Sequence, residues 1–250
     1  MQKSSTYNYC VEPFTEDYSG KLSWGNMGNL LLRCASLHAG EHGFGYPQMI
    51  SLHHAWVLSR LVIEIDEMPT TGEHFSIETW VDKLYRQFTD RHFSILRPNG
   101  TAYGHATSIW ALIDTSTRLP ADLESLPNGG FTGVLIPERP APIAAMGRIR
   151  MKQPQLVLTH KAAYSDLDIN GHVNSIRYIE LLLDCLPFDT LKLRHAKRIE
   201  MAYCQEAYCG ETLYVFQETD AKNADRQLFE IKVEERIIVK GSITYGSEKT

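Results

Sequence analysis

Residues 164–184 read YSDLDINGHVNSIRYIELLLD, a polar turn that runs directly into an amphipathic segment. Polar side chains occupy alternate positions of the turn: Asp166, Asp168, Asn170, His172 and Asn174. Apolar residues follow at the spacing of one buried helical face: Val173, Ile176, Ile179, Leu182 and Leu183. The pattern predicts a helix over 171–185. Because a helix N-terminus presents unpaired N–H groups and a partial positive charge, this turn is suited to polarising a carbonyl.

The rest of the chain forms two similar series of elements. In the first, periodicity predicts a strand, a helix and four more strands, over residues 7–11, 25–38, 54–66, 75–85, 87–97 and 102–114. In the second, it predicts a strand, the helix and further strands, over residues 155–163, 171–185, 196–207, 213–218 and 227–243, the last region being two strands or one bent strand. Proline and glycine interrupt the pattern over 127–150, which predicts a linker between domains 1–126 and 151–250. Helices combined with antiparallel strands indicate the α+β class.

Short sequence matches at constant spacing favour a duplicated domain. Tyr18-Ser19 and Gly25 line up with Tyr164-Ser165 and Gly171, and Gly72-Glu73 resembles Gly210-Glu211. In this alignment, the polar residues Asp168, Asn170 and His172 stand opposite Leu22, Trp24 and Asn26. We therefore expect the second half to carry polar chemistry and the first half to be apolar at the same place.

Composition excludes several classes of protein. A formal charge of −5 and a pI near 6.1 argue against nucleic acid or an anionic membrane as the main partner, since both select basic surfaces. The five cysteines are scattered without a C-x-x-C pair, so the sequence predicts no disulfide framework, zinc site or other cofactor. The first ten residues lack a signal-peptide core, and no run approaches the roughly 18 apolar residues of a membrane helix, so we expect a cytoplasmic protein.

The turn gathers an acid, an amide and an imidazole, a set that can orient a water for hydrolysis. Plainer explanations exist: Asp168 before a helix is often a cap, and a single His is often structural. Glu206, in MAYCQEAYCG near a predicted strand end, is a candidate second acid, although isolated glutamates there usually face solvent. Cys204 and Cys209 are candidate nucleophiles, but a strand cysteine is more often a core residue. No G-x-S-x-G, Walker, G-x-G-x-x-G or H-E-x-x-H motif occurs, which removes the corresponding enzyme classes.

Several stretches resemble the acyl-acyl carrier protein (acyl-ACP) thioesterases of bacteria and plant plastids, which are double hotdog proteins. DLDINGHVNSIRYIELLLD resembles the family's D-x-D-x-N-x-H-V-N-x-x-x-Y signature. HHAWVLSRLVIEIDEMPTTGEHFSIETWV and SIWALIDTSTRLP resemble two blocks of its first half. The resemblance implies a tandem (double) hotdog fold, in which each half is a long helix wrapped by a curved antiparallel sheet.

The resemblance also implies a hydrolase that cleaves the acyl-ACP thioester, releases free fatty acid and terminates fatty acid synthesis. The family's catalytic Asp, Asn and His match Asp168, Asn170 and His172, and the acid of its R-R-E-C-G-type block matches Glu206. The family's neighbouring cysteine is Ala207 here, so a thiol mechanism at that position is impossible. A water activated by Glu206 or Asp168 is expected instead, and Cys209 remains a displaced alternative.

Further site residues follow from this mechanism. We expect backbone N–H groups of Gly171, His172 and Val173 to polarise the carbonyl. The first half would supply an apolar slot for the acyl chain, including Trp56, Trp80 and Met27, although a single aromatic residue of this kind is more often part of the ordinary core.

The implied partner is an acyl carrier protein with a phosphopantetheine-linked acyl chain. Because carrier proteins are acidic, docking would use one of two basic runs, which are Arg148, Arg150 and Lys152, or Arg194, Lys197 and Arg198. A homodimer is left open. The alternatives are an acyl-CoA thioesterase of the same fold, a non-catalytic acyl-binding hotdog protein, and a hydratase or dehydratase. The intact set of Asp168, Asn170 and His172 argues against the non-catalytic protein, and the N-G-H-V-N context fits a thioesterase better than a hydratase or dehydratase.

Overall fold

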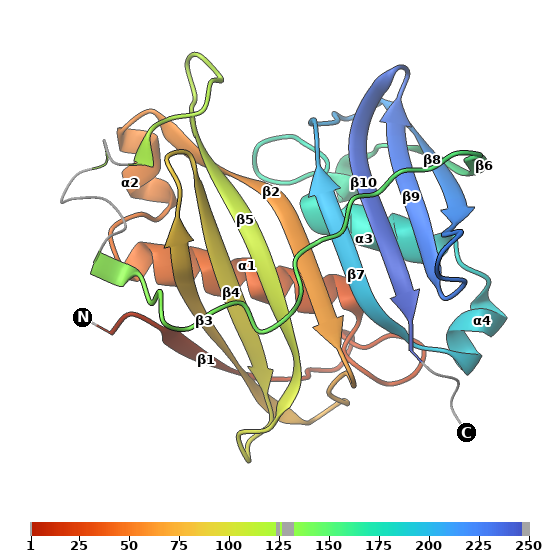
Figure 1. The fold of residues 1–250 in the computed structure, drawn as a ribbon, viewed down its shortest axis with the longest axis horizontal. Coiled ribbons are helices and arrows are strands. Elements are labelled where there is room, and N and C mark those ends of the chain that lie inside the picture. The colour runs from red at the N-terminus through yellow and green to blue at the C-terminus, as the bar shows by residue number, and fades with distance from the viewer. Residues whose placement is uncertain (1, 124–125, 127–132, 247–250) are drawn as a thin grey trace. The chain divides into compact units, whose positions relative to one another are not determined.

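The computed structural model describes the chain except residues 1, 124–125, 127–132 and 247–250 (Figure 1). The chain divides into two compact units, residues 1–61 with 67–145 and residues 62–66 with 146–250. Part of the predicted linker, 127–132, lies outside the described residues. Among the residues that the structure describes, no helix is long and apolar enough to cross a membrane.

The first unit is a long helix packed on antiparallel strands. Its sheet has the strand order β1-β3-β4-β5-β2. The strands are β1 (Ser5–Cys10), β2 (His54–Ile65), β3 (His74–Leu84), β4 (Phe88–Leu96) and β5 (Ala102–Asp114), and the last residues of β2 belong to the second unit. The helices are α1 (Trp24–Glu41) and a short α2 (Tyr46–Ser51). Figure 1 shows α1 lying across one face of these strands.

Helix α1 forms where the apolar spacing predicts it. The Ser23 side chain caps its N-terminus by accepting the Asn26 N–H. The helix buries one face against β3, made of Met27, Leu31, Cys34, Ala35 and His38. This face fills the core of the first unit.

The second unit repeats the arrangement. Its strands follow the order β7-β10-β9-β8-β6. They are β6 (Gln155–Lys161), β7 (Ala196–Tyr203), β8 (Thr212–Thr219), β9 (Arg226–Val233) and β10 (Arg236–Tyr245). Helix α3 (Ser175–Asp184) packs on β7 and β10, and a short α4 (Phe188–Leu193) follows it. A Cβ at Gly241 on β10 would lie 2.6 Å from Leu182 Cδ2, so glycine allows α3 to approach the strand closely. Both units are therefore hotdogs, and the predicted α+β double hotdog class is confirmed.

Two boundaries near the predicted site differ from the sequence prediction. Helix α3 begins at Ser175 rather than at residue 171, because the Asn174 side chain caps it by accepting the Ile176 N–H at 2.8 Å. Strand β7 ends at Tyr203 rather than at residue 207, because the chain turns where the N–H groups of Cys204 and Gln205 both reach the Ile238 carbonyl. The 227–243 region forms two strands, one of the two forms predicted for it, and the short helices α2 and α4 were not predicted. These ends depend on capping and turn hydrogen bonds that hydrophobic periodicity does not encode.

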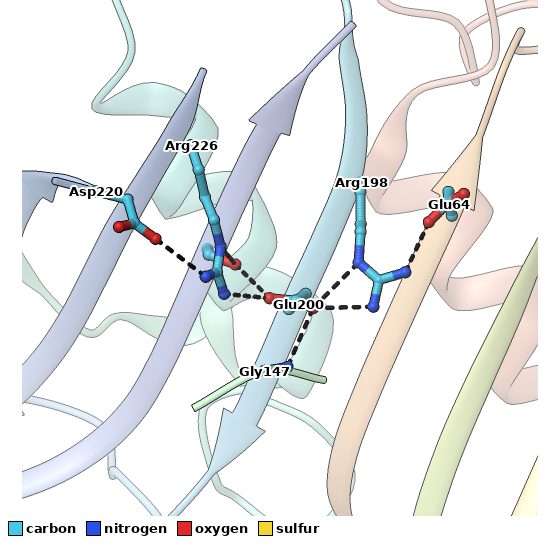
Figure 2. Close-up of polar contacts among 7 residues, drawn as sticks. Glu64, Gly147, Arg198, Glu200, Asp220 and Arg226 are labelled. Atoms are coloured by element: carbon cyan, nitrogen blue, oxygen red, sulfur yellow. Dashed lines mark hydrogen bonds and ion pairs between the residues drawn. The ribbon is translucent and has the colours of Figure 1, made fainter. Parts of the chain in front are cut away.

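A buried carboxylate organises one face of the second unit (Figure 2). Glu200 on β7 accepts hydrogen bonds from Arg198 Nη2 at 2.9 Å, Arg226 Nη2 at 2.5 Å and Ser242 Oγ at 2.7 Å. Burial alone would raise the pKa of Glu200, but the hydrogen bonds from Ser242 and Arg198 and the two guanidinium charges outweigh it, so its pKa lies below the ordinary value. The Gly147 N–H, 3.4 Å from Glu200 Oε1, brings the segment that precedes β6 onto this network.

Candidate active site

The predicted catalytic turn is closed by its own backbone. The Asp168 N–H donates to the His172 carbonyl at 2.8 Å, and the Gly171 N–H donates to the Asp168 carbonyl at 3.0 Å. Asp168 Oδ1 accepts the N–H groups of Asn170 at 2.8 Å and His172 at 3.2 Å. Gly171 has φ +77°, a left-handed conformation that glycine adopts without steric cost. The turn therefore holds Asn170 and His172 on a fixed backbone, and Asp168 acts as a turn residue.

The backbone N–H groups predicted to polarise a carbonyl are already bonded within the protein. Gly171 and His172 donate to Asp168, as described above, and the Val173 N–H donates to the Ala207 carbonyl at 2.9 Å. The start of α3, with its helix dipole, lies further along the chain at Ser175. The oxyanion role predicted for Gly171 and Val173 therefore has no support in the geometry. The physical reason is that the Gly171 and His172 N–H groups close the turn, and the Val173 N–H joins the turn to the loop after β7.

His172 and Glu206, which are 34 positions apart in the sequence, meet at the site. His172 Nδ1 lies 3.4 Å from Glu206 Oε1, and the two side chains are 21% and 27% exposed. Glu206 lies in the loop after β7, not on the strand predicted to end at residue 207. An imidazole against a carboxylate, within reach of solvent, is an arrangement that can accept and return a proton.

Three residues around the pair were not singled out from the sequence. The Tyr208 hydroxyl donates to Glu206 Oε2 at 3.2 Å, and its ring meets the His172 ring edge-on with centroids 5.1 Å apart. Arg236 donates to the Glu206 carbonyl at 3.1 Å and also pairs with Glu211. Glu211 in turn accepts the Tyr208 N–H at 2.9 Å. The repeated Gly-Glu dipeptide was the one sequence signal that marked part of this set.

Asp166 has a structural place beside the site. It is 1% exposed, and it accepts hydrogen bonds from His160 Nε2, Arg177 Nε and the Ala163 N–H, all at 2.8 Å. Burial alone would raise the pKa of Asp166, but these hydrogen bonds outweigh it and hold the pKa below its ordinary value. The Asp166 carbonyl also accepts the Asn174 N–H at 2.8 Å, so Asp166 fixes the segment that enters α3.

The first unit contains a turn with the same backbone, at Asp17–Leu22. The Asp17 N–H donates to the Lys21 carbonyl at 2.8 Å, the Gly20 N–H donates to the Asp17 carbonyl at 3.0 Å, and Asp17 Oδ1 accepts the Ser19 N–H at 2.8 Å. Gly20 has φ +73°. Each bond has its counterpart in the second unit. The corresponding pairs are therefore Asp17 with Asp168, Ser19 with Asn170, Gly20 with Gly171, and Lys21 with His172.

This correspondence corrects the alignment of the two halves. Gly25, which the sequence matched to Gly171, is buried inside α1, and the true counterpart is Gly20. The first-unit turn is thus not apolar, because it keeps an acid and two polar side chains. The Leu22 N–H donates to the Pro69 carbonyl as Val173 does to Ala207, which places Met68 opposite Glu206. The first unit therefore lacks the imidazole and its carboxylate partner at these positions. The predicted match of Gly72-Glu73 with Gly210-Glu211 agrees with the structure, because Glu73 accepts the Thr70 N–H as Glu211 accepts the Tyr208 N–H.

The predicted acyl-contacting residues all lie in the first unit. Met27 and Trp80 are fully buried there, and the Trp80 indole donates to the Arg139 carbonyl at 3.0 Å while the Arg139 guanidinium covers its ring. The Trp56 indole donates to the Phe44 carbonyl at 2.9 Å and packs on a hydrophobic cluster. All three have core contacts, and their contact with an acyl chain stays a prediction.

The two basic runs differ in their partners. In the second run, Arg194 pairs with Asp225 at 2.9 Å and Lys197 with Asp66 at 2.8 Å. Arg198 lies between Glu64 and Glu200, as Figure 2 shows. The first run, Arg148, Arg150 and Lys152, is exposed, and within the described part of the chain no carboxylate forms an ion pair with it. The acid beside the first run, Glu218, accepts the backbone N–H of Lys152 at 2.7 Å, whereas the side chains of the second run are each paired with a carboxylate.

Cysteine and metal chemistry receive no geometric support. All five cysteines are free thiols, with Cys204 and Cys209 exposed. Over the residues that the structure describes, no group of three or more His, Cys, Asp or Glu side chains is arranged to hold a metal ion.

Family models match both halves of the chain. A model described as acyl-ACP thioesterase N-terminal domain matches residues 2–125, and one described as acyl-ACP thioesterase C-terminal domain matches residues 150–247. A palmitoyl-acyl carrier protein thioesterase of Gossypium hirsutum chloroplasts is 25% identical over 76% of this chain and 48% of its own length. An oleoyl-acyl carrier protein thioesterase of Arabidopsis thaliana is 30% identical over 72% and 54%. The chain thus spans about half the length of the plant proteins it matches.

Solved structures agree with these matches. An acyl-ACP thioesterase from Bacteroides thetaiotaomicron superposes with a TM-score of 0.90, at 41% identity and with 98% of each chain covered. A 12:0-ACP thioesterase from Umbellularia californica, at 16% identity, has the same fold, with a TM-score of 0.84 over 99% of this chain and 95% of its own.

Proposed function

Because the chain belongs to the acyl-ACP thioesterase family, we propose that it hydrolyses the thioester of acyl-ACP, releases a free fatty acid and so ends fatty acid synthesis. The observation that carries this proposal is the His172–Glu206 pair, held next to the Asp168 turn in the second unit. Only this unit has both an imidazole and a carboxylate at these positions.

The geometry supports acid/base hydrolysis by water. Glu206 Oε1 lies 3.4 Å from Nδ1 of His172 and favours the tautomer with its proton on that nitrogen, which leaves Nε2 as the proton acceptor. A water that loses its proton to Nε2 attacks the thioester carbonyl carbon. The C–S bond then breaks, and the proton on Nε2 passes to the leaving sulfur. The products are the fatty acid and the free thiol of the carrier.

The Asn170 side chain is assigned the role of hydrogen-bond donor to the carbonyl oxygen of the thioester. It is exposed on the fixed turn, and its side-chain amide can donate two hydrogen bonds. Since the nearby backbone N–H groups are bonded within the turn, the amide is the donor that the turn can offer to a developing oxyanion. Asp168 contributes by shaping the turn, which leaves Glu206 as the acid that acts with His172.

The carrier protein is proposed to dock on the exposed basic run of Arg148, Arg150 and Lys152. Charge pairing of this kind raises the rate of encounter and weakens with salt. Reversing Arg148 and Arg150 to Glu should therefore raise KM for acyl-ACP and leave hydrolysis of a short acyl-pantetheine unchanged. Trp56, Trp80 and Met27 stay proposed as contacts of the acyl chain.

The test compares carriers and variants. Purified protein is incubated with matched acyl chains on ACP and on CoA, and release of free thiol is followed. We expect faster turnover on ACP, and loss of that turnover in Glu206→Gln, which keeps the shape of the side chain but removes its charge. Equal or faster turnover on CoA would make this an acyl-CoA thioesterase, and no turnover on either carrier would indicate an acyl-binding protein.

A further inference from the structure

The loop after β7 presents Tyr208 between the two members of the proposed catalytic pair. The Tyr208 hydroxyl donates to Glu206 Oε2 at 3.2 Å, while Glu206 Oε1 faces His172. The Tyr208 ring meets the imidazole edge-on, with an interplanar angle of 89°. The two carboxylate oxygens therefore have different neighbours, a phenol on one side and an imidazole on the other.

We propose that the Tyr208 hydroxyl is a positioning group that holds the Glu206 carboxylate against His172, an inference that rests on the proposed function. A carboxylate on a flexible side chain can rotate about its last bonds, and a hydrogen bond to one oxygen fixes where the other points. Glu206 is 27% exposed, so without such a bond water would compete for both oxygens.

The backbone around Tyr208 fixes where its hydroxyl can reach. His172 and Tyr208 form an antiparallel bridge, which ties the loop to the catalytic turn. The Tyr208 N–H is held by Glu211, and Arg236 holds both Glu211 and the Glu206 carbonyl. The hydroxyl is thus aimed by four contacts that do not involve the substrate.

The first unit supplies a comparison in which the catalytic pair is missing. There Lys21 and Thr70 form the equivalent bridge, and the Thr70 N–H is held by Glu73 as Tyr208 is by Glu211. The residue opposite Glu206 is Met68, and Thr70 has no ring or phenol. The same loop backbone therefore exists without the aromatic side chain, and the aromatic side chain is present in the unit that has a carboxylate to hold.

Removing a single oxygen atom distinguishes the role of the Tyr208 hydroxyl from the role of its ring. Tyr208→Phe keeps the ring against His172 and removes the donor to Glu206, and Tyr46→Phe, at an exposed position on α2, is the matched control. We expect Tyr208→Phe to lower kcat on acyl-ACP about fivefold, as expected for one lost hydrogen bond, with KM changed less than about twofold. The control should match the unmodified protein. Unchanged kcat in Tyr208→Phe would overturn the proposal.

A second readout does not depend on turnover. Removing the donor leaves the Glu206 carboxylate free to rotate away from Nδ1 of His172. At one fixed pH, the Nδ1 chemical shift of His172 should therefore change in Tyr208→Phe and stay unchanged in Tyr46→Phe. A chemical shift equal to that of the unmodified protein would overturn the proposal. A changed chemical shift in a protein that hydrolyses no acyl-ACP would support the positioning role and refute the proposed function.

Discussion

The turns at Asp17–Leu22 and Asp168–Val173 share a backbone and differ in their side chains. Both share three hydrogen bonds at the turn acid, and both use glycine at a left-handed position. The first carries Lys21, whose Nζ pairs with Glu67 at 3.3 Å. The second carries His172, which faces Glu206. The difference is therefore one of side-chain chemistry placed on an unchanged frame.

This comparison changes how the acid of the turn is understood. Asp17 accepts the N–H of Ser19 just as Asp168 accepts that of Asn170, although the first unit has no imidazole at this place. An aspartate at this position is therefore required by the turn itself. His172 and Glu206, whose places are taken by Lys21 and Met68 in the first unit, are the residues that distinguish the candidate catalytic copy.

The largest effect should come from replacing His172. His172→Ala removes the proposed proton acceptor and should lower kcat on acyl-ACP by about 10² to 10⁴ with the fold intact. Lys21→Ala, at the corresponding position, should leave kcat within about twofold. Thiol release gives the rates, and circular dichroism checks the fold. If Lys21→Ala were as damaging as His172→Ala, the assignment of chemistry to one turn would be wrong.

The next largest effect concerns the residue two positions before each turn acid. Asp166→Ala leaves Arg177 and His160 without their buried partner and should lower the free energy of unfolding by about 3 kcal/mol. Thr15, its counterpart, donates one hydrogen bond to the Glu12 carbonyl, so Thr15→Ala should cost about 1 kcal/mol. Urea denaturation at neutral pH measures both.

The Asp166 contribution should also depend on pH. Because the folded pKa of Asp166 lies below its ordinary value, the stability it provides is fully present above the unfolded pKa of about 3.9 and is lost as the pH falls through the folded pKa. The difference between the unmodified protein and Asp166→Ala should therefore shrink below about pH 4. A difference that stays constant into that range would contradict this account.

Replacing the two turn glycines should have equal effects on stability and unequal effects on activity. No heavy atom outside the adjoining residues lies within 4 Å of a Cβ built at Gly20 or Gly171. Alanine should therefore lower the free energy of unfolding only by the strain of its left-handed backbone conformation, about 1 kcal/mol at each site. Turnover should fall in Gly171→Ala and stay unchanged in Gly20→Ala. Urea denaturation and thiol release test this together, and a much larger loss of stability at one site would show that the two frames are not equivalent.

The smallest effect is expected at the exposed thiols. Cys204→Ala and Cys209→Ala should each change turnover by less than about twofold, because neither thiol is part of the His172–Glu206 pair. An inactive but folded Cys209→Ala variant would restore the case for a cysteine nucleophile.

Sequence patterns gave the class of the fold and most of its elements. The apolar faces of α1 and α3, the strands of both halves and the D-x-N-G-H turn are local features, and their periodicity or turn chemistry is visible in a few consecutive residues. The same local signals gave an incorrect register between the halves, because chance identities at Tyr18-Ser19 and Gly25 outweighed the one glycine that the turn geometry requires.

By itself, the sequence determined that the chain is an α+β double hotdog with an acid, an amide and an imidazole in one turn. The tertiary structure decided which donors remain usable, that Glu206 faces His172, that Tyr208, Glu211 and Arg236 surround this pair, and that one basic run is neutralised. The physical reason is that the contacts of His172 with Glu206, of Arg236 with Glu206 and of Arg198 with Glu64 join groups far apart in the chain, and that even the local contacts depend on the geometry of the loops that carry them. Such pairings form only when the strands and turns that carry the groups are brought together.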